Sequence, residues 1–78
     1  MKPENWDKLP AHTKRRIADD LVNSLRGNYI VSQALALAIQ SLKAVPKPRQ
    51  EVSNIQDMEM LREAKFSMPI HIEGKGLV

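Results

Sequence analysis

The chain contains no cysteine and only one residue each of tryptophan, tyrosine and phenylalanine. The absence of cysteine excludes disulfides, thiolate metal sites and thiol catalysis, and it favours a cytoplasmic setting over a secreted one. With so few aromatic residues, a platform on which nucleic-acid bases could stack is not expected. The first residues lack the apolar run of a signal peptide, and the longest uncharged stretch is shorter than the roughly 18 residues that a membrane-spanning helix needs. We therefore expect a cytoplasmic protein without a membrane segment.

The sequence also lacks the motifs of common catalytic and cofactor sites. The glycines, Gly27, Gly74 and Gly76, form neither a Walker A loop nor a dinucleotide-binding fingerprint. The histidines, His12 and His71, are far apart in the sequence and do not have the spacing of metal ligands. No serine lies in a nucleophile elbow. We therefore expect no enzymatic activity, no catalytic residue, no cofactor and no metal site.

What the chain does contain is a stretch of fourteen residues, 29–42, without a formal charge. At a helical period its apolar residues cover an arc of roughly 200°, which is wider than the stripe of roughly 100° on an ordinary surface helix. Gly27 and Asn28 favour a tight reversal before this stretch, and Pro46 favours a helix end shortly after it. We predict a central helix that packs on more than one neighbour.

Two further helices are predicted on either side of this central one. The first covers residues 10–26, because proline suits the first helical position and apolar residues then recur at helical spacing. Gly27 is expected to end it, which would fold the first two helices into an antiparallel hairpin. The third covers residues 54–65, because Ser53 and Gln56 have the spacing of a capping box.

Residues 67–78 differ in character, because Pro69 ends the helical pattern and the residues from Ile70 to Glu73 alternate apolar and polar as in a strand. A single strand is not stable alone, so this segment would pair with a second copy, join a partner's sheet, lie along the helices or remain mobile. We predict an all-α fold with a helical hairpin, a third short helix and an extended C-terminal arm. Residues 1–66 would form a small helical domain, and residues 67–78 an extended or flexible arm.

The apolar surface of such a fold is more than a chain of 78 residues can readily hide. We expect a small non-enzymatic protein–protein interaction module that forms a homodimer, with the central helix as its seam, and acts as an adaptor or regulator by docking on a larger protein. The predicted interface residues are Val31, Leu35, Ala38, Leu42, Met58, Met60, Ile70 and Ile72.

A second hypothesis is a small basic nucleic-acid-binding regulator. Twelve Lys and Arg against nine Asp and Glu give a net charge of +3, and Lys14, Arg15 and Arg16 at the start of the first helix could contact phosphates. Asp19 and Asp20 neutralise part of this cluster. In a helix-turn-helix protein the helix after the turn is polar and basic, whereas here it is the uncharged one. We therefore place this hypothesis second to protein binding.

Overall fold

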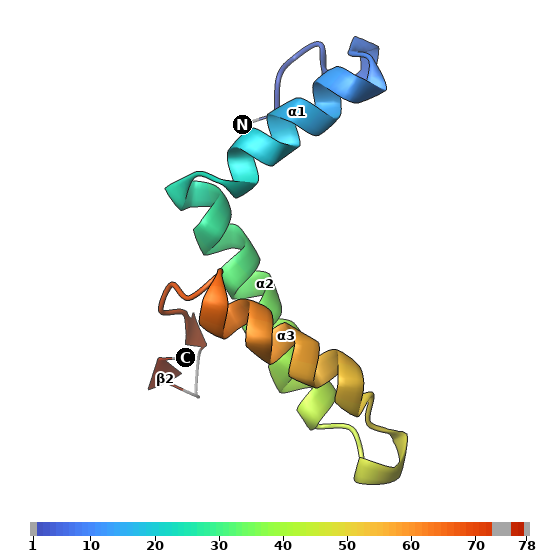
Figure 1. Ribbon diagram of the computed structural model, residues 1–78, viewed down its shortest axis with the longest axis vertical. Helices are drawn as coiled ribbons and strands as arrows, with labels where there is room; N and C mark the ends of the chain where they lie inside the picture. The colour runs from blue at the N-terminus through green and yellow to red at the C-terminus, as the bar shows by residue number, and fades with distance from the viewer. Residues whose placement is uncertain (1, 73–75, 78) are drawn as a thin grey trace.

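The computed structural model of the chain describes residues 2–72 and 76–77. Helices dominate these residues, and the all-α fold with three helices that the sequence predicts is confirmed. The elements in chain order, where η marks a short 3-10 helix, are η1 (Trp6–Lys8), α1 (Ala11–Val22), α2 (Leu25–Lys43), η2 (Lys47–Arg49), α3 (Val52–Ala64), β1 (His71–Ile72) and β2 (Gly76–Leu77) (Figure 1).

The first two helices are separated by a sharp bend at Asn23 and Ser24, which we call the elbow. Ser24 is the N-cap of α2: its Oγ accepts a hydrogen bond from the backbone N–H of Gly27 at 3.0 Å and donates one to the carbonyl oxygen of Leu21 at 2.6 Å. A serine with extended backbone thus satisfies a donor that lacks a helical partner at the start of α2. The first helix therefore ends at Val22, and the prediction that it continues to residue 26 is wrong.

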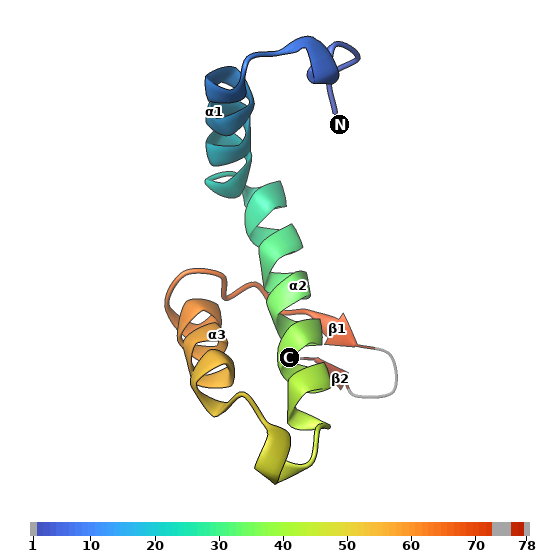
Figure 2. The same cartoon turned by 90° about the vertical axis from the view of Figure 1, so that its right-hand side faces the viewer.

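Gly27 lies inside the first turn of α2 and does not end the first helix, contrary to the prediction. It is buried because the end of α1 passes close to it: a Cβ atom here would overlap the carbonyl group of Leu21 and lie 2.9 Å from the Cα of Val22. The glycine is therefore required for the close approach of two helices and not for a left-handed cap. Figures 1 and 2 show α1 leading away from α2, so the predicted reversal between these two helices is not formed.

The helical hairpin of the structure is formed by α2 and α3, which lie antiparallel and side by side (Figures 1 and 2). Gln50 Nε2 closes the connection between them by donating to the carbonyl oxygens of Lys43 at 3.2 Å and Val45 at 2.8 Å. At the other end, Asn28 Nδ2 donates to the carbonyl oxygen of Lys65 at 2.8 Å. Side-chain hydrogen bonds to the backbone thus tie both ends of this hairpin.

The ends of α2 and α3 agree with the sequence more closely than their starts do. α2 ends at Lys43, shortly before Pro46, and α3 ends one residue before the expected position. α3 begins at Val52, two residues early, and Glu51 at its N-cap position makes no side-chain capping hydrogen bond. The predicted capping residue Ser53 therefore lies inside the helix.

The core is small and is centred between α2 and α3. The buried apolar residues among the described positions are Ala36, Ile55, Phe66 and Ile70. Ser32, one turn before Ala36 on α2, is also fully buried, and its carbonyl oxygen accepts a hydrogen bond from Arg62 of α3. By contrast, Ile30 and Leu37 of α2 are 42% and 47% exposed. The predicted apolar arc therefore does not face α3, because α2 packs there through small side chains that let the two helices approach closely.

The C-terminal segment folds back onto its own chain. Phe66 and Ile70 are buried, and β1 pairs antiparallel with β2 so that His71 lies opposite Leu77 and Ile72 opposite Gly76. The strand that the sequence predicts near Ile70 thus has a partner within the chain, which the sequence did not indicate. Figure 2 shows α3 and the two strands on opposite sides of α2, so the central helix has a neighbour on each of two sides.

Candidate functional site

The chain is more extended than a compact domain of its length. Its Cα radius of gyration is 15.4 Å, whereas a compact chain of this length has a radius of about 11.5 Å. Its accessible surface is 6401 Å², which is about 1,600 Å² more than mass scaling gives for a compact monomer of 8.8 kDa. The chain therefore exposes more surface than a compact monomer of its mass.

Large apolar side chains contribute to this surplus. Those exposed among the described residues are Leu21, Leu25, Tyr29, Ile30, Leu37, Val52, Met60 and Leu61. Leu25, the first residue of α2, is the most open of them at 82% exposure. They lie on all three helices.

The exposed face of α2 has the spacing of a helix-packing seam. Ile30, Ala34, Leu37 and Ser41 are all exposed and follow one another at intervals of four, three and four residues. This spacing keeps apolar residues in register with a facing helix. We call these four residues the outer seam. Since Leu37 lies five residues after the buried Ser32, the outer seam is roughly 140° around the helix from the side that α3 covers.

The α2 residues that the sequence predicts as a dimer interface lie beside the outer seam. Each of them follows a seam residue by one position, and all are half-buried: Val31, Leu35, Ala38 and Leu42. The structure thus shifts the open face by one residue, or about 100° around the helix. A single sequence could not distinguish the two faces, because the apolar arc includes both.

The other predicted interface residues do not form one patch with these. Met58 and Ile72 are half-buried, whereas Met60 is 59% exposed. Met60 lies five residues after the buried Ile55, and therefore on the side of α3 that faces away from α2. Ile70 is only 2% exposed, so it belongs to the core of its own chain.

The outward side of α3 forms a second apolar surface, which we call the outer face of α3. It consists of Met60, Leu61 and Ala64, which are exposed and lie within one turn of each other. Asp57, also exposed, precedes Met60 by three residues and Leu61 by four, so a carboxylate borders the apolar side chains. A methionine next to a leucine gives an adaptable surface of the kind found at protein interfaces.

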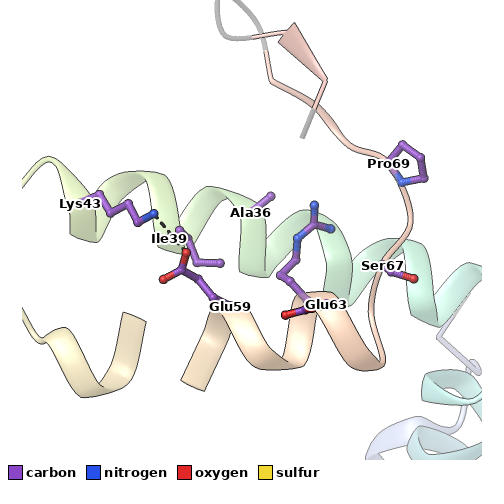
Figure 3. A pocket seen from close by; sticks show the side chains of 8 residues that line it. Ala36, Ile39, Lys43, Glu59, Glu63, Ser67 and Pro69 are labelled. Atoms are coloured by element: carbon purple, nitrogen blue, oxygen red, sulfur yellow. Dashed lines mark hydrogen bonds and ion pairs between the residues drawn. The ribbon is translucent and has the colours of Figure 1, made fainter. Parts of the chain in front are cut away.

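An open groove of about 710 Å³ lies between α2, α3 and the segment after α3 (Figure 3). Its lining residues are Ala36, Ile39, Lys43, Glu59, Arg62, Glu63, Ser67 and Pro69. Lys43 and Glu59 reach across it and form an ion pair at 3.1 Å (Figure 3). The lining carries two positive and two negative side chains and contains no histidine or cysteine. Its chemistry is that of a polar boundary between packed helices and lacks the usual base of a catalytic triad.

Arg62 ties the end of α3 to both neighbouring parts of the chain. Its Nη1 donates to the carbonyl oxygens of Ser32 at 3.3 Å, Phe66 at 3.3 Å and Met68 at 3.1 Å. One guanidinium thereby joins α2, the residue after α3 and the segment that leads to β1. The sequence analysis missed this role, because an arginine on a helix carries no sign of which carbonyl groups it meets.

The basic residues predicted as a possible nucleic-acid contact lie on the first two turns of α1. Lys14 is half-buried, with its Nζ 5.7 Å from the ring centroid of Trp6 in η1, an arrangement that permits a cation–π interaction. Arg15 and Arg16 are exposed. The structure therefore uses one of the three cations within the chain, and phosphate binding by this cluster stays a prediction.

No protein-family model matches the chain, and no curated protein or solved structure matches it either. Within residues 2–72 and 76–77, no cluster of three or more His, Asp or Glu side chains is arranged to hold a metal ion. None of the helices in the same residues combines the length and apolarity needed to cross a membrane. The candidate binding surfaces of the described residues are the outer seam of α2, the outer face of α3 and α1.

Proposed function

We propose that the chain is a small non-enzymatic protein–protein interaction module, which forms a homodimer and acts as a cytoplasmic adaptor or regulator by docking on a larger protein. The observation that supports this is the surplus surface of about 1,600 Å² relative to a compact monomer. A standard interface covers about 800 Å² on each partner, so the surplus corresponds to two such faces on every copy. The lack of cysteine accords with the reducing cytoplasm.

The outer seam of α2 is the candidate face for self-association. Its residues Ile30 and Leu37 would anchor the contact, and the small side chains of Ala34 and Ser41 would let a facing helix approach. α2 carries no charge between Arg26 and Lys43. Two identical copies can therefore bring this face to a common interface without opposing like charges or burying an unpaired one.

The outer face of α3 is the candidate face for a larger partner. Because α3 covers the side of α2 opposite the outer seam, Met60 and Leu61 remain accessible when the seam is occupied. Dimerisation and docking can thus take place together. This separation of two surfaces is what an adaptor requires, since one surface must hold the assembly while the other binds a partner.

The solution mass of the chain tests the self-association. Light scattering after size exclusion, over a wide dilution range at low and high salt, should give a dimer whose stability does not depend on ionic strength. Leu37→Glu should convert it to a monomer, because a charge would be buried in an apolar contact. Gln56→Glu, which places the same charge on an exposed site of α3, should remain dimeric. A wild-type chain that stays monomeric at every concentration would refute the homodimer.

A further inference from the structure

The helix α3 shows only negative charge to the solvent. Its acidic residues Asp57, Glu59 and Glu63 are all exposed. Its basic residue, Arg62, is half-buried and donates to three backbone carbonyl oxygens. The chain as a whole has a net charge of +3. The exposed side of α3 therefore has the opposite sign to the net charge of the molecule.

One of the three carboxylates is already paired within the chain. Glu59 Oε2 lies 3.1 Å from Lys43 Nζ of α2, across the groove between the two helices (Figure 3). Among residues 2–72 and 76–77, neither Asp57 nor Glu63 forms an ion pair. Two carboxylates of α3 are therefore available to the cations of another molecule.

These two carboxylates bracket the apolar centre of the outer face of α3. Asp57 precedes Met60 by three residues and Glu63 follows it by three, so at helical spacing they lie roughly 60° to either side of Met60 and about 9 Å apart along the axis. Met60 is 59% exposed and Leu61 beside it is 46% exposed. The outer face of α3 thus has an apolar centre with a negative charge one turn before it and one turn after it.

The cation that follows α3 does not lie among these side chains. Lys65 is roughly 140° around the helix from Met60, and its Nζ is 5.4 Å from the ring centroid of Phe66. That arrangement permits a cation–π interaction within the chain. The last turn of α3, which includes Glu63, also carries the partial negative charge of a helix C-terminus. The potential at the outer face of α3 therefore favours a cationic partner.

We propose that the outer face of α3 binds a cationic amphipathic helix of the partner protein. The apolar side of that helix covers Met60 and Leu61, and its lysine or arginine side chains pair with Asp57 and Glu63. This inference rests on the proposed function, which assigns a larger partner to this face and leaves the chemistry of that partner open. A methionine at the centre can adapt to apolar side chains of different shapes.

A helical occupant fits this face better than an extended segment. The backbone N–H and carbonyl groups in the middle of α3 are used within the helix, so a strand would find no edge to pair with. The sign of the partner's charge follows from the rim. An acidic helix would place like charges next to Asp57 and Glu63, and an uncharged one would partly desolvate both carboxylates without pairing them.

Two designed peptides test the sign of the partner's charge. Each is an amphipathic helix of about 20 residues with leucine along one side. The polar side carries lysine in one peptide and glutamate in the other, and each peptide has a fluorescein label. Fluorescence anisotropy with the full chain should show at least about tenfold tighter binding of the lysine peptide. Because the net charge of the chain is +3, non-specific attraction would favour the glutamate peptide instead.

Matched charge variants locate the binding site. Asp57→Asn combined with Glu63→Gln removes both rim charges with little change of shape, and the affinity for the lysine peptide should fall about fivefold at low salt. Asp19→Asn combined with Asp20→Asn makes the same change in net charge on exposed sites of α1, which lies away from α3 (Figures 1 and 2). This control should bind the peptide like the wild-type chain, and circular dichroism verifies that both double variants are folded.

Binding of the lysine peptide that the α3 variant weakens and the α1 variant leaves unchanged supports the proposal. Equal binding of the two peptides, equal effects of the two variants, or no binding of either peptide overturns it. In the first two cases Met60→Ser separates the proposals: if it weakens the binding, docking on the outer face of α3 stands without a cationic helix, and if it has no effect, both fail. A loss of dimer mass in the α3 variant alone would make a second copy the occupant and would also overturn the proposal.

Discussion

The substitution Gly27→Ala tests whether the elbow is held by close backbone contact. In an ordinary helix, alanine is favoured over glycine by about 0.5 to 1 kcal/mol. Here the added Cβ would overlap the carbonyl group of Leu21, and neither that group nor Val22 Cα can move without shifting α1. Overpacking of this kind costs about 1 to 3 kcal/mol. We therefore expect a net loss of about 1 to 2 kcal/mol in the free energy of unfolding.

The assay is urea and thermal unfolding followed by circular dichroism, with wild type and variant at equal protein concentration because the proposed self-association would make stability depend on concentration. The loss corresponds to a melting temperature lower by roughly 5 to 15 °C for a chain of this size. Ser24→Ala removes the cap without crowding and should cost about 1 kcal/mol. Because both changes act on the same elbow, the double variant should lose less than the sum of the two. A Gly27→Ala chain as stable as wild type, or more stable, would refute this interpretation of the elbow.

Three further predictions concern the packing of α2 and α3, each measured by urea unfolding. Ile55→Ala should cost about 2 to 4 kcal/mol, because Ile55 is 5% exposed and its removal leaves a cavity in a small core; a loss below 1 kcal/mol would contradict its place in the core. Arg62→Met should cost about 1 to 3 kcal/mol and raise hydrogen exchange of the segment after α3, because three carbonyl groups lose a charged donor. Arg62→Lys should be intermediate, since lysine keeps the charge but lacks the planar guanidinium that places Nη1 among the three carbonyl oxygens, and unchanged exchange in both variants would exclude the role of Arg62. Glu59→Gln should cost less than about 1 kcal/mol, because its ion pair with Lys43 is about half exposed, and a larger loss would show that the pair is structural.

The class of fold and the ends of α2 and α3 could be predicted because they depend on local features. Pro46 limits α2 and Pro69 limits the helical region that includes α3, wherever the rest of the chain lies. The elbow could not be predicted in this way. The pair Gly27 and Asn28 has the composition of a helix end, but a glycine serves equally well where two backbones approach closely. Tertiary contacts decide whether a glycine ends a helix or lets two backbones approach closely. In this chain Gly27 serves the close approach, and Ser24 is the cap.

The orientation of α2 was unpredictable for a related reason. An apolar arc of roughly 200° shows that a helix has several neighbours and does not show which neighbour lies on which side. Ser32 and Ala36 face α3 because they are small, and Arg62 then reaches the carbonyl oxygen of Ser32. Of the outer face of α3, only Met60 was among the interface residues predicted from the sequence. Which side of a helix faces its neighbour depends on where that neighbour lies, and residue type alone does not decide it.

The middle of α2 lacks charged residues, and each of its three sides has a different environment. On one side it packs against α3 through small residues, and a charge there would be buried without a partner. On the side of Val31, Leu35, Ala38 and Leu42 it is half-buried within its own chain. The outer seam is open to solvent in a single copy, where lysine or glutamate would be favoured, yet it carries Ile30 and Leu37. A single copy leaves this third apolar side uncovered, and it is the side that the proposed self-association would cover.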